Sequence, residues 1–326
     1  LRQADLIHNS FEVGYEDPVP RGVLRQWSAF LERSDAWDFG GLATQGTSGF
    51  SGRAMFLNKW TASASVRYSE TEVDTRLLRG GPAMRLSPFL HLSIRGESDA
   101  SRRLLVSAGV HAHTYRDGDS SMFNFFPGLR VRVTDRLSVS AHYEYGHQVD
   151  DLQYVDTPET VTGPRYVLGN IDQTTHSLTI RLNVSITPDL TLQYYGSPFV
   201  SAGSYTAFRK ATDTLASEYG DRFHLYDPDE ISFDPEGNAY HVQEAEGGPG
   251  SQYSFDNPDF SFRQFRSNLV ARWEYRPGSA LYVVWSQGRT SDSPLYDDSL
   301  GHNFDELWRS TARNVLLVKL QHWFSL

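Results

Sequence analysis

The chain has 326 residues, a net charge of −10 and no cysteine, which excludes a disulfide framework and thiol chemistry. Its mean hydropathy is −0.47 and it contains no apolar run of about eighteen residues. A transmembrane helix is therefore excluded, but a transmembrane barrel is not, because its strands are apolar on one side only. Aromatic residues make up 13% of the chain and favour the barrel, whose interfacial girdles use Tyr, Trp and Phe.

The negative charge is concentrated between Phe199 and Phe260. This segment contains twelve acidic residues against Arg209, Lys210 and Arg222, so its net charge is −9. The rest of the chain is nearly neutral. No nucleic-acid partner is expected, because binding to nucleic acid needs a basic surface.

Amphipathic strands follow one another along most of the chain. Leu6 to Tyr15 and Gly22 to Trp37 are strand-like but irregular. After them, apolar and polar residues alternate with the period of two that predicts half-buried strands. The alternating segments are 53–57, 61–68, 86–95, 103–115, 129–133, 137–145, 177–187, 190–195, 268–275, 281–287 and 314–324. The last of them contains Trp323 and Phe324 and is similar to the aromatic end strand of an outer-membrane barrel.

The connections between these segments alternate in length. Short ones lie at 58–59, 97–101, 135, 188–189 and 277–278, and long ones at 70–84, 146–175, 199–260 and 289–312, with the short connection 116–121 as an exception. Bacterial outer-membrane barrels have short periplasmic turns and long extracellular loops. A soluble β-sandwich remains open as the alternative fold.

The sequence therefore predicts an all-β fold, an antiparallel transmembrane β-barrel of the outer-membrane type, formed by one domain over residues 1–326 with roughly 13 or more strands. The short turns at Asn58, Asp135, Pro188 and Pro277 are expected on one rim together with the C-terminus. The acidic segment 199–260 is then an extracellular loop or hairpin insertion. Because residue 1 is not Met, we read the chain as the C-terminal portion of a longer protein, whose upstream part supplies any missing strands.

Several stretches resemble a known family. They are Thr75-Arg76 with Arg79 to Pro82, Gln153 to Val155, Leu190 to Tyr194 with Pro198 to Gly203, and Asn268 to Arg289. The chain resembles an uncharacterised family of outer-membrane β-barrels that follow a periplasmic, family-nine-like carbohydrate-binding module. The resemblance implies a barrel in the outer membrane of a Gram-negative bacterium, in contact with lipid and lipopolysaccharide, and supplies no catalytic residue.

Charged and histidine side chains on the polar side of the strands are expected to line the lumen. They are Arg95, Arg103, His111, His113, Arg130, Arg132, His142, Glu144, Arg181, Arg272, Glu274 and Lys319. Basic rows of this kind can attract anions or be consumed in salt bridges, and both readings stay open. His111 and His113 point the same way and could bind a metal with His91 or His142, the alternative being polar residues that face water.

The acidic segment offers a candidate cation-binding loop. Asp227, Asp229, Asp234 and Glu236 are hard oxygen ligands close together in sequence and could hold Ca²⁺. The EF-hand spacing is missing, and Asp234 to Asn238 is also typical of a turn between strands 230–233 and 239–242. Other cofactors are not expected.

Three classes of function follow from these patterns. The first is a porin-like barrel that admits small polar or carbohydrate-type solutes or anchors a periplasmic binding module. The second is a structural barrel whose acidic extracellular loops dock a protein partner. The third is an outer-membrane hydrolase, although no nucleophile elbow, zinc-protease motif or phosphate-binding loop occurs in the sequence.

Overall fold

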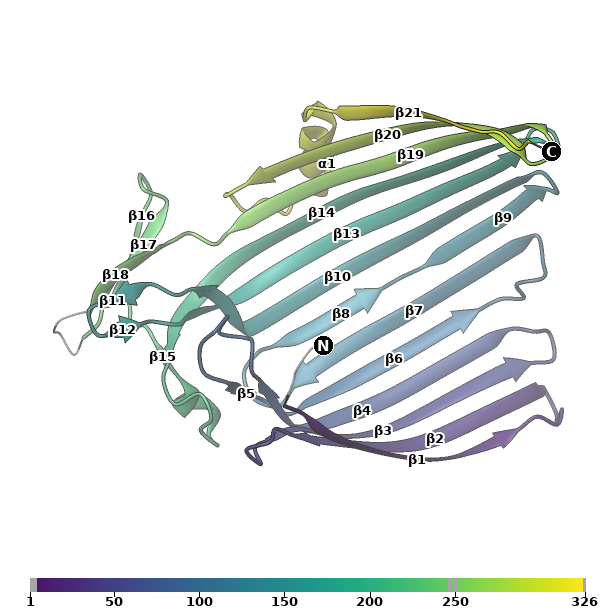
Figure 1. The fold of residues 1–326 in the computed structure, drawn as a ribbon. Helices are drawn as coiled ribbons and strands as arrows, with labels where there is room; N and C mark the ends of the chain where they lie inside the picture. Colours follow the sequence, from purple (N-terminus) through teal and green to yellow (C-terminus); the bar gives the residue numbers. More distant parts are fainter. Residues whose placement is uncertain (1–4, 246–247, 249–250, 325–326) are drawn as a thin grey trace.

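The computed structural model describes residues 5–245, 248 and 251–324, which form an all-β structure built around one large antiparallel sheet (Figure 1). Its strands in spatial order are β1 (Ile7–Asp17), β2 (Leu24–Trp37), β3 (Ala43–Phe56), β4 (Thr61–Asp74), β6 (Phe89–Glu97), β7 (Leu104–Tyr115), β8 (Ser121–Phe125), β10 (Leu137–Asp156), β13 (Val167–Ser185), β14 (Leu190–Ala211), β19 (Phe260–Arg276), β20 (Ser279–Ser293) and β21 (Arg313–Gln321). β9 (Gly128–Thr134) continues the line of β8, since both pair with β7 and β10. The path thus has thirteen strands, in agreement with the number expected.

Short strands and helices lie at the ends of these strands. β5 (Met84–Leu86) pairs with β4, β15 (Phe223–Leu225) pairs with β14, and β11 (Glu159–Thr160) pairs with β12 (Gly163–Pro164). β16 (Ile231–Asp234), β17 (Ala239–Gln243) and β18 (Gln252–Asp256) form a separate three-stranded sheet, which follows a short 3-10 helix at Tyr219–Arg222. The α-helix α1 (Leu300–Arg309) lies between β20 and β21. No helix in the described part of the chain is long and apolar enough to cross a membrane.

The connections alternate between two rims because neighbouring strands are antiparallel (Figure 1). One rim carries the short turns at 57–60, 98–103, 135–136, 186–189 and 277–278, together with the end of β21. The opposite rim, called the loop rim below, carries the long connections 75–88, 157–166, 212–259 and 294–312. The expected grouping of the short turns with the C-terminal strand end is confirmed.

The two edges of the sheet remain apart. Within the described residues, β1 pairs only with β2 and β21 only with β20, and Figure 1 shows the two edge strands on opposite sides of a curved sheet. Residues of both edge strands are exposed almost throughout. Neighbouring strands run in opposite directions. The first and the thirteenth strand of the path, β1 and β21, therefore run toward the same rim.

Four expected loop boundaries are wrong because the strands continue past the alternating pattern. β4 extends to Asp74, so the loop expected at 70–84 begins at residue 75. β10 extends to Asp156 and β13 starts at Val167, so the loop expected at 146–175 is reduced to 157–166. β14 extends to Ala211, so the acidic insertion begins after it and not at Phe199. β20 extends to Ser293, and α1 occupies part of the loop expected at 289–312. Near the loop rim other segments cover the sheet. Polar and apolar residues therefore no longer alternate along these parts of the strands.

Two small apolar cores hold the loop rim together. One consists of Val167, Phe208, Tyr226, Val242 and Phe255 and packs the three-stranded sheet against the ends of β13 and β14. The other consists of Leu78, Met84, Leu152 and Leu168 and packs the 75–88 loop against β10 and β13. These cores order the long connections.

Candidate functional site

The register of the sheet separates its side chains into two faces, because residues paired across strands point to the same side. A polar face is defined by the paired positions Glu12, Glu32, Gly49, Arg67, His91, His113, Met122, Gln148, Gln173 and Gly203. The row nearer the short turns contains Arg132, Ser138, Asn183 and Gln193. This face carries charged and hydrogen-bonding side chains from β1 across to β14.

The other side is an apolar face, and much of it is exposed. One paired row consists of Val13, Leu31, Phe50, Val66, Leu92, Ala112 and Phe123. A second consists of Val131, Val139, Leu182, Tyr194, Leu269, Trp285 and Leu316. Phe50 is 50% exposed and Leu316 is 69% exposed, so no described segment covers these positions. Such continuous exposed apolar rows are unusual on a soluble monomer.

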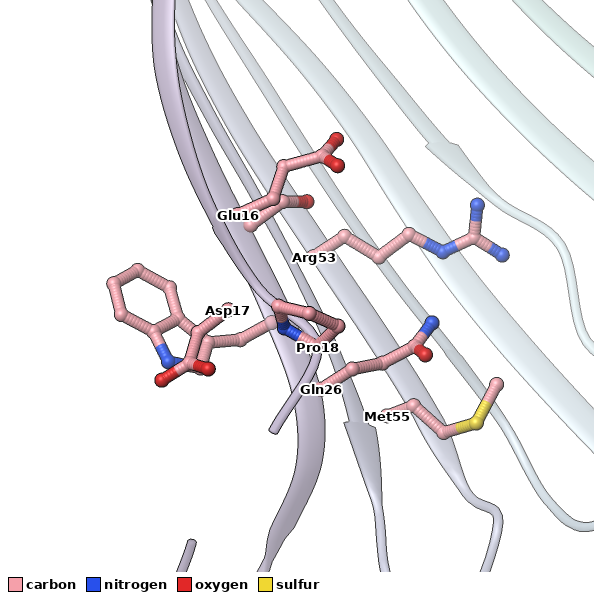
Figure 2. A pocket seen from close by; sticks show the side chains of 8 residues that line it. Glu16, Asp17, Pro18, Gln26, Arg53 and Met55 are labelled. Atoms are coloured by element: carbon pink, nitrogen blue, oxygen red, sulfur yellow. The ribbon is translucent and has the colours of Figure 1, made fainter. Parts of the chain in front are cut away.

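The sheet is curved (Figure 1), and the labelled side chains of Figure 2 show which side of it is polar. Figure 2 shows Glu16, Gln26 and Arg53 projecting into the space that the curved sheet surrounds, whereas Asp17 points the other way. Together with Met55 these residues line a recess of about 360 Å³ near the short-turn rim. The concave side is therefore polar, charged and open to water.

The register places the expected lumen residues on this polar face. Arg95, His111, His113, Arg130, Arg132, His142, Glu144, Arg181, Arg272, Glu274 and Lys319 all occupy positions paired within polar rows. Arg103 directly precedes β7, and its carbonyl accepts a hydrogen bond from the amide of Arg132.

Three of the histidines lie close together. Nδ1 of His91 lies 2.6 Å from Nε2 of His113, so one ring donates a hydrogen bond to the other. The ring of His111 lies 5.8 Å from that of His91 and packs edge-on against Phe126. His142 pairs with Gly128, in a different row, and does not join them. Among the described residues, no group of three or more His, Asp or Glu side chains has a geometry suited to a metal.

Several arginines of the polar face are already neutralised. The guanidinium of Arg67 lies 2.8 Å from Glu32, and that of Arg272 lies 2.6 Å from Glu274. Arg95 lies 3.8 Å from Glu97.

Arg132 lies on the polar face and also holds a neighbouring turn. Its Nη2 donates to the carbonyls of Ala100 and Arg102 and so clamps the 98–103 turn. The Nη2 group is thus occupied by the protein's own backbone and positions the neighbouring turn.

The candidate cation-binding loop does not form as one site. Asp227 and Asp229 precede β16, whereas Asp234 is its last residue and Glu236 follows it. At about 3.3 Å per residue the strand separates the two pairs by more than about 10 Å. The alternative reading is correct, because residues 231–234 pair with 239–242 across a turn. Asn238 adopts a φ of 48° there, a conformation that Asn tolerates better than most residues.

Two buried carboxylates, Glu230 and Glu244, stabilise this three-stranded sheet through contacts with the protein itself. Burial alone would raise the pKa of Glu230, but backbone hydrogen bonds from Ala245 and Asp227 and the nearby His224 lower it to about 2. Glu244 lies 3.2 Å from Arg165 and 3.0 Å from Lys210. Both carboxylates are held by the protein itself.

Two basic residues of the polar face were missed. Arg53 begins the expected strand 53–57, but this short segment does not show which side Arg53 occupies, and its pairing with Ser28 and Ser63 places it on the polar face. Arg266 lies in the part of β19 where Phe and polar residues occur on both sides, so no alternation marks it. Extending the period of two backward from Asn268 is the signal that could have found Arg266.

These features define a class of protein, a large antiparallel β-sheet with a polar concave face and an exposed apolar convex face. Over residues 1–325 the sequence matches the family described as Domain of unknown function (DUF5916), and the chain belongs to that family. No curated protein matches the chain. A solved structure of the NanC porin is similar over 85% of this chain and 86% of its own, with 9% identity and a TM-score of 0.25. A TM-score this low supports no transfer of function, so the reasoning below uses this chain's own residues.

Proposed function

We propose that this chain forms part of the wall of an outer-membrane β-barrel of a Gram-negative bacterium. The polar face of its sheet lines a path for small polar solutes, carbohydrates among them. The observation that carries the proposal is the exposed apolar face, which extends in register across most of the sheet. In water such a surface would drive aggregation, whereas a bilayer solvates it.

The height of the apolar face fits a bilayer. On β13 and the residue after it, the apolar positions run from Leu178 to Ile186, a stretch of nine residues. A tilted transmembrane strand needs about 9 to 11 residues to cross the hydrocarbon core. Toward the loop rim the same side of the sheet becomes polar, at Thr174 and Asp172, as expected where a strand leaves the membrane.

Closure of the barrel requires further strands. β1 and β21 run in the same direction, so pairing them directly would be parallel, whereas bacterial barrels are antiparallel throughout. An odd number of additional strands between these edges restores antiparallel pairing and gives an even total. In this arrangement the short turns are periplasmic and the loop rim is extracellular.

The test is the conductance of the intact protein in planar lipid bilayers. Discrete current steps are expected if the polar face bounds an aqueous path. Liposome swelling with a neutral sugar provides a second readout of solute passage. A protein that inserts in lipid, as judged by resistance to extraction, and yet shows neither steps nor swelling contradicts the solute path.

A second candidate function is docking of a protein partner at the loop rim. The acidic insertion 212–259 contains a three-stranded sheet that shares an apolar core with the ends of β13 and β14, and it projects beyond the ends of the main strands (Figure 1). Phe233 is 44% exposed on this sheet. A membrane-inserted but non-conducting protein that loses a bound partner on deletion of residues 231–256 would favour this function over the first.

A further inference from the structure

We propose that Arg130 and Arg181 form an anion-binding subsite that holds a carboxylate or phosphate group of a small hydroxylated solute. This inference rests on the proposed function, since it places the polar face against an aqueous path. It goes further by naming the class of solute and the side chains that select it.

The register brings the two arginines to either side of one serine. Ser140 on β10 pairs with Arg130 on β9 and with Arg181 on β13. Neighbouring strands lie about 4.8 Å apart, so the two arginine Cα atoms are about 10 Å apart on the same face. Both arginines are exposed, and their long side chains can converge on one ligand above Ser140.

Neither guanidinium forms an ion pair with any carboxylate in the described part of the chain, in contrast to Arg67 and Arg272. Glu144 is the nearest carboxylate on the same face of β10 and lies four residues from Ser140, about 13 Å along the strand. Glu97 lies on β6, which β7 separates from β9, and its carboxylate lies 3.8 Å from Arg95. The wall formed by β2 to β4 is therefore salt-bridged, whereas the wall formed by β9 to β13 keeps an excess of positive charge.

Arg181 is oriented by an aromatic ring. Its guanidinium carbon lies 5.4 Å from the centre of the Tyr195 ring, and Tyr195 is its partner in the pairing of β13 with β14. A guanidinium over a ring keeps its N–H donors free, because these lie in the guanidinium plane. The planar fork of Arg suits the two oxygens of a carboxylate or phosphate.

The same row supplies groups for the uncharged part of the ligand. Beyond Tyr195 it continues to Asn268 and Ser286, which are hydrogen-bonded to each other at 2.6 Å. Amide and hydroxyl groups suit the hydroxyls of a sugar ring. The row as a whole therefore fits sugar acids or sugar phosphates better than simple inorganic anions.

The experiment measures binding to the intact protein in nonionic detergent at low ionic strength, where charge interactions are least screened. The probes are glucuronate, glucose 6-phosphate and neutral glucose. We expect the stronger of the two anions to bind about tenfold or more tightly than glucose, as the loss of one charge-assisted pair typically changes affinity by this factor. The anion that gains more identifies carboxylate or phosphate as the preferred group.

Variants assign the effect to the two arginines. Arg130→Gln with Arg181→Gln should reduce the affinity for both anions to that for glucose. Arg272→Gln with Glu274→Gln removes a neutralised pair from the same face and should leave the preference unchanged. The double variant Arg130→Lys and Arg181→Lys keeps the positive charge and is the control for misfolding. It should retain part of the preference for the anions.

Equal affinity of the native protein for glucose and both anions, or a full preference in the double Gln variant, would overturn the proposal. Conductance of the same preparations separates it from the proposed function. An anion preference without conductance contradicts only the solute path. Conductance without an anion preference contradicts only the subsite.

Discussion

Gly49 shows how a single position on the polar face is determined by its neighbours. Glu32 and Arg67 lie on the strands to either side of it, and their ion pair crosses directly over the glycine. A Cβ atom at Gly49 would lie 2.5 Å from Oε1 of Glu32. The absence of a side chain on β3 therefore allows a salt bridge between β2 and β4.

Leu182 and Asn183 provide a matched pair for testing the two faces. Leu182 belongs to an apolar row and Asn183 to a polar row. An arginine facing lipid near the midplane costs about 2 to 4 kcal/mol. We expect Leu182→Arg to reduce folding yield in lipid vesicles strongly and Asn183→Arg to change it little. Equal yields for the two variants, measured by the same gel-shift or fluorescence assay, would contradict the assignment of the faces.

Glu230 gives the three-stranded sheet a defined response to acid. Its pKa is lowered to about 2 from a usual value of 4.5, so its contribution to stability is complete above about pH 4.5 and is lost as the pH falls through 2. Hydrogen exchange of the β16 to β18 amides, corrected for the intrinsic rate, should show protection decreasing across this window. Glu230→Gln should remove this dependence, and an unchanged profile in the variant would assign it to another group.

The helix α1 was missed in the sequence because it interrupts a region of strands. Ser299 caps it by accepting a hydrogen bond from the amide of His302. On its buried side Asn303 accepts from Nε of Arg263 at 2.6 Å, and Trp308 packs against Phe265. The helix therefore covers polar and aromatic positions on the convex face near the loop rim.

Replacement of Asn303 tests the docking of this helix. Asn303 is 1% exposed and Arg263 is 4% exposed, so Asn303→Ala leaves the buried Nε of Arg263 without its acceptor, at a cost of about 1 to 3 kcal/mol. We expect faster hydrogen exchange or proteolysis within residues 294–312. Asp305→Ala, on the exposed side of the helix, is the control. Equal protection in both variants would mean that the Arg263 contact does not hold the helix.

The strands that lie within the apolar band were predictable, and those outside it were not. Ser177 to Thr187 has one polar and one apolar side because it faces two different environments, and β13 contains most of it. Only the end of β3, within 53–57, was predicted, because the glycines in its earlier part have low strand propensity, although its neighbours fix the whole strand in the sheet. The sequence could identify which side of a strand Arg181 occupies, but the choice between paired and unpaired arginines required the register.

At the scale of the whole molecule, charge is divided between the concave face and the loop rim. The insertion 212–259 contains twelve acidic residues and one basic residue, Arg222, for a net charge of −11. The polar face carries Arg130 on β9 and Arg181 on β13, which form no ion pair within the described residues. If this rim is extracellular, an anionic solute meets the acidic insertion beside the path before it reaches Arg130 and Arg181.

The most direct test of the account is the sidedness of the two rims. The chain has no cysteine, so single cysteines can be introduced at the exposed positions Asp229 and Glu236 on the insertion and at Asp135 and Asp189 on short turns. A membrane-impermeant maleimide added to intact cells should label the first two and not the others, and permeabilised cells should show labelling of all four. Labelling of the short turns but not the insertion in intact cells, or the same labelling of all four, would contradict a membrane-spanning sheet with an extracellular loop rim.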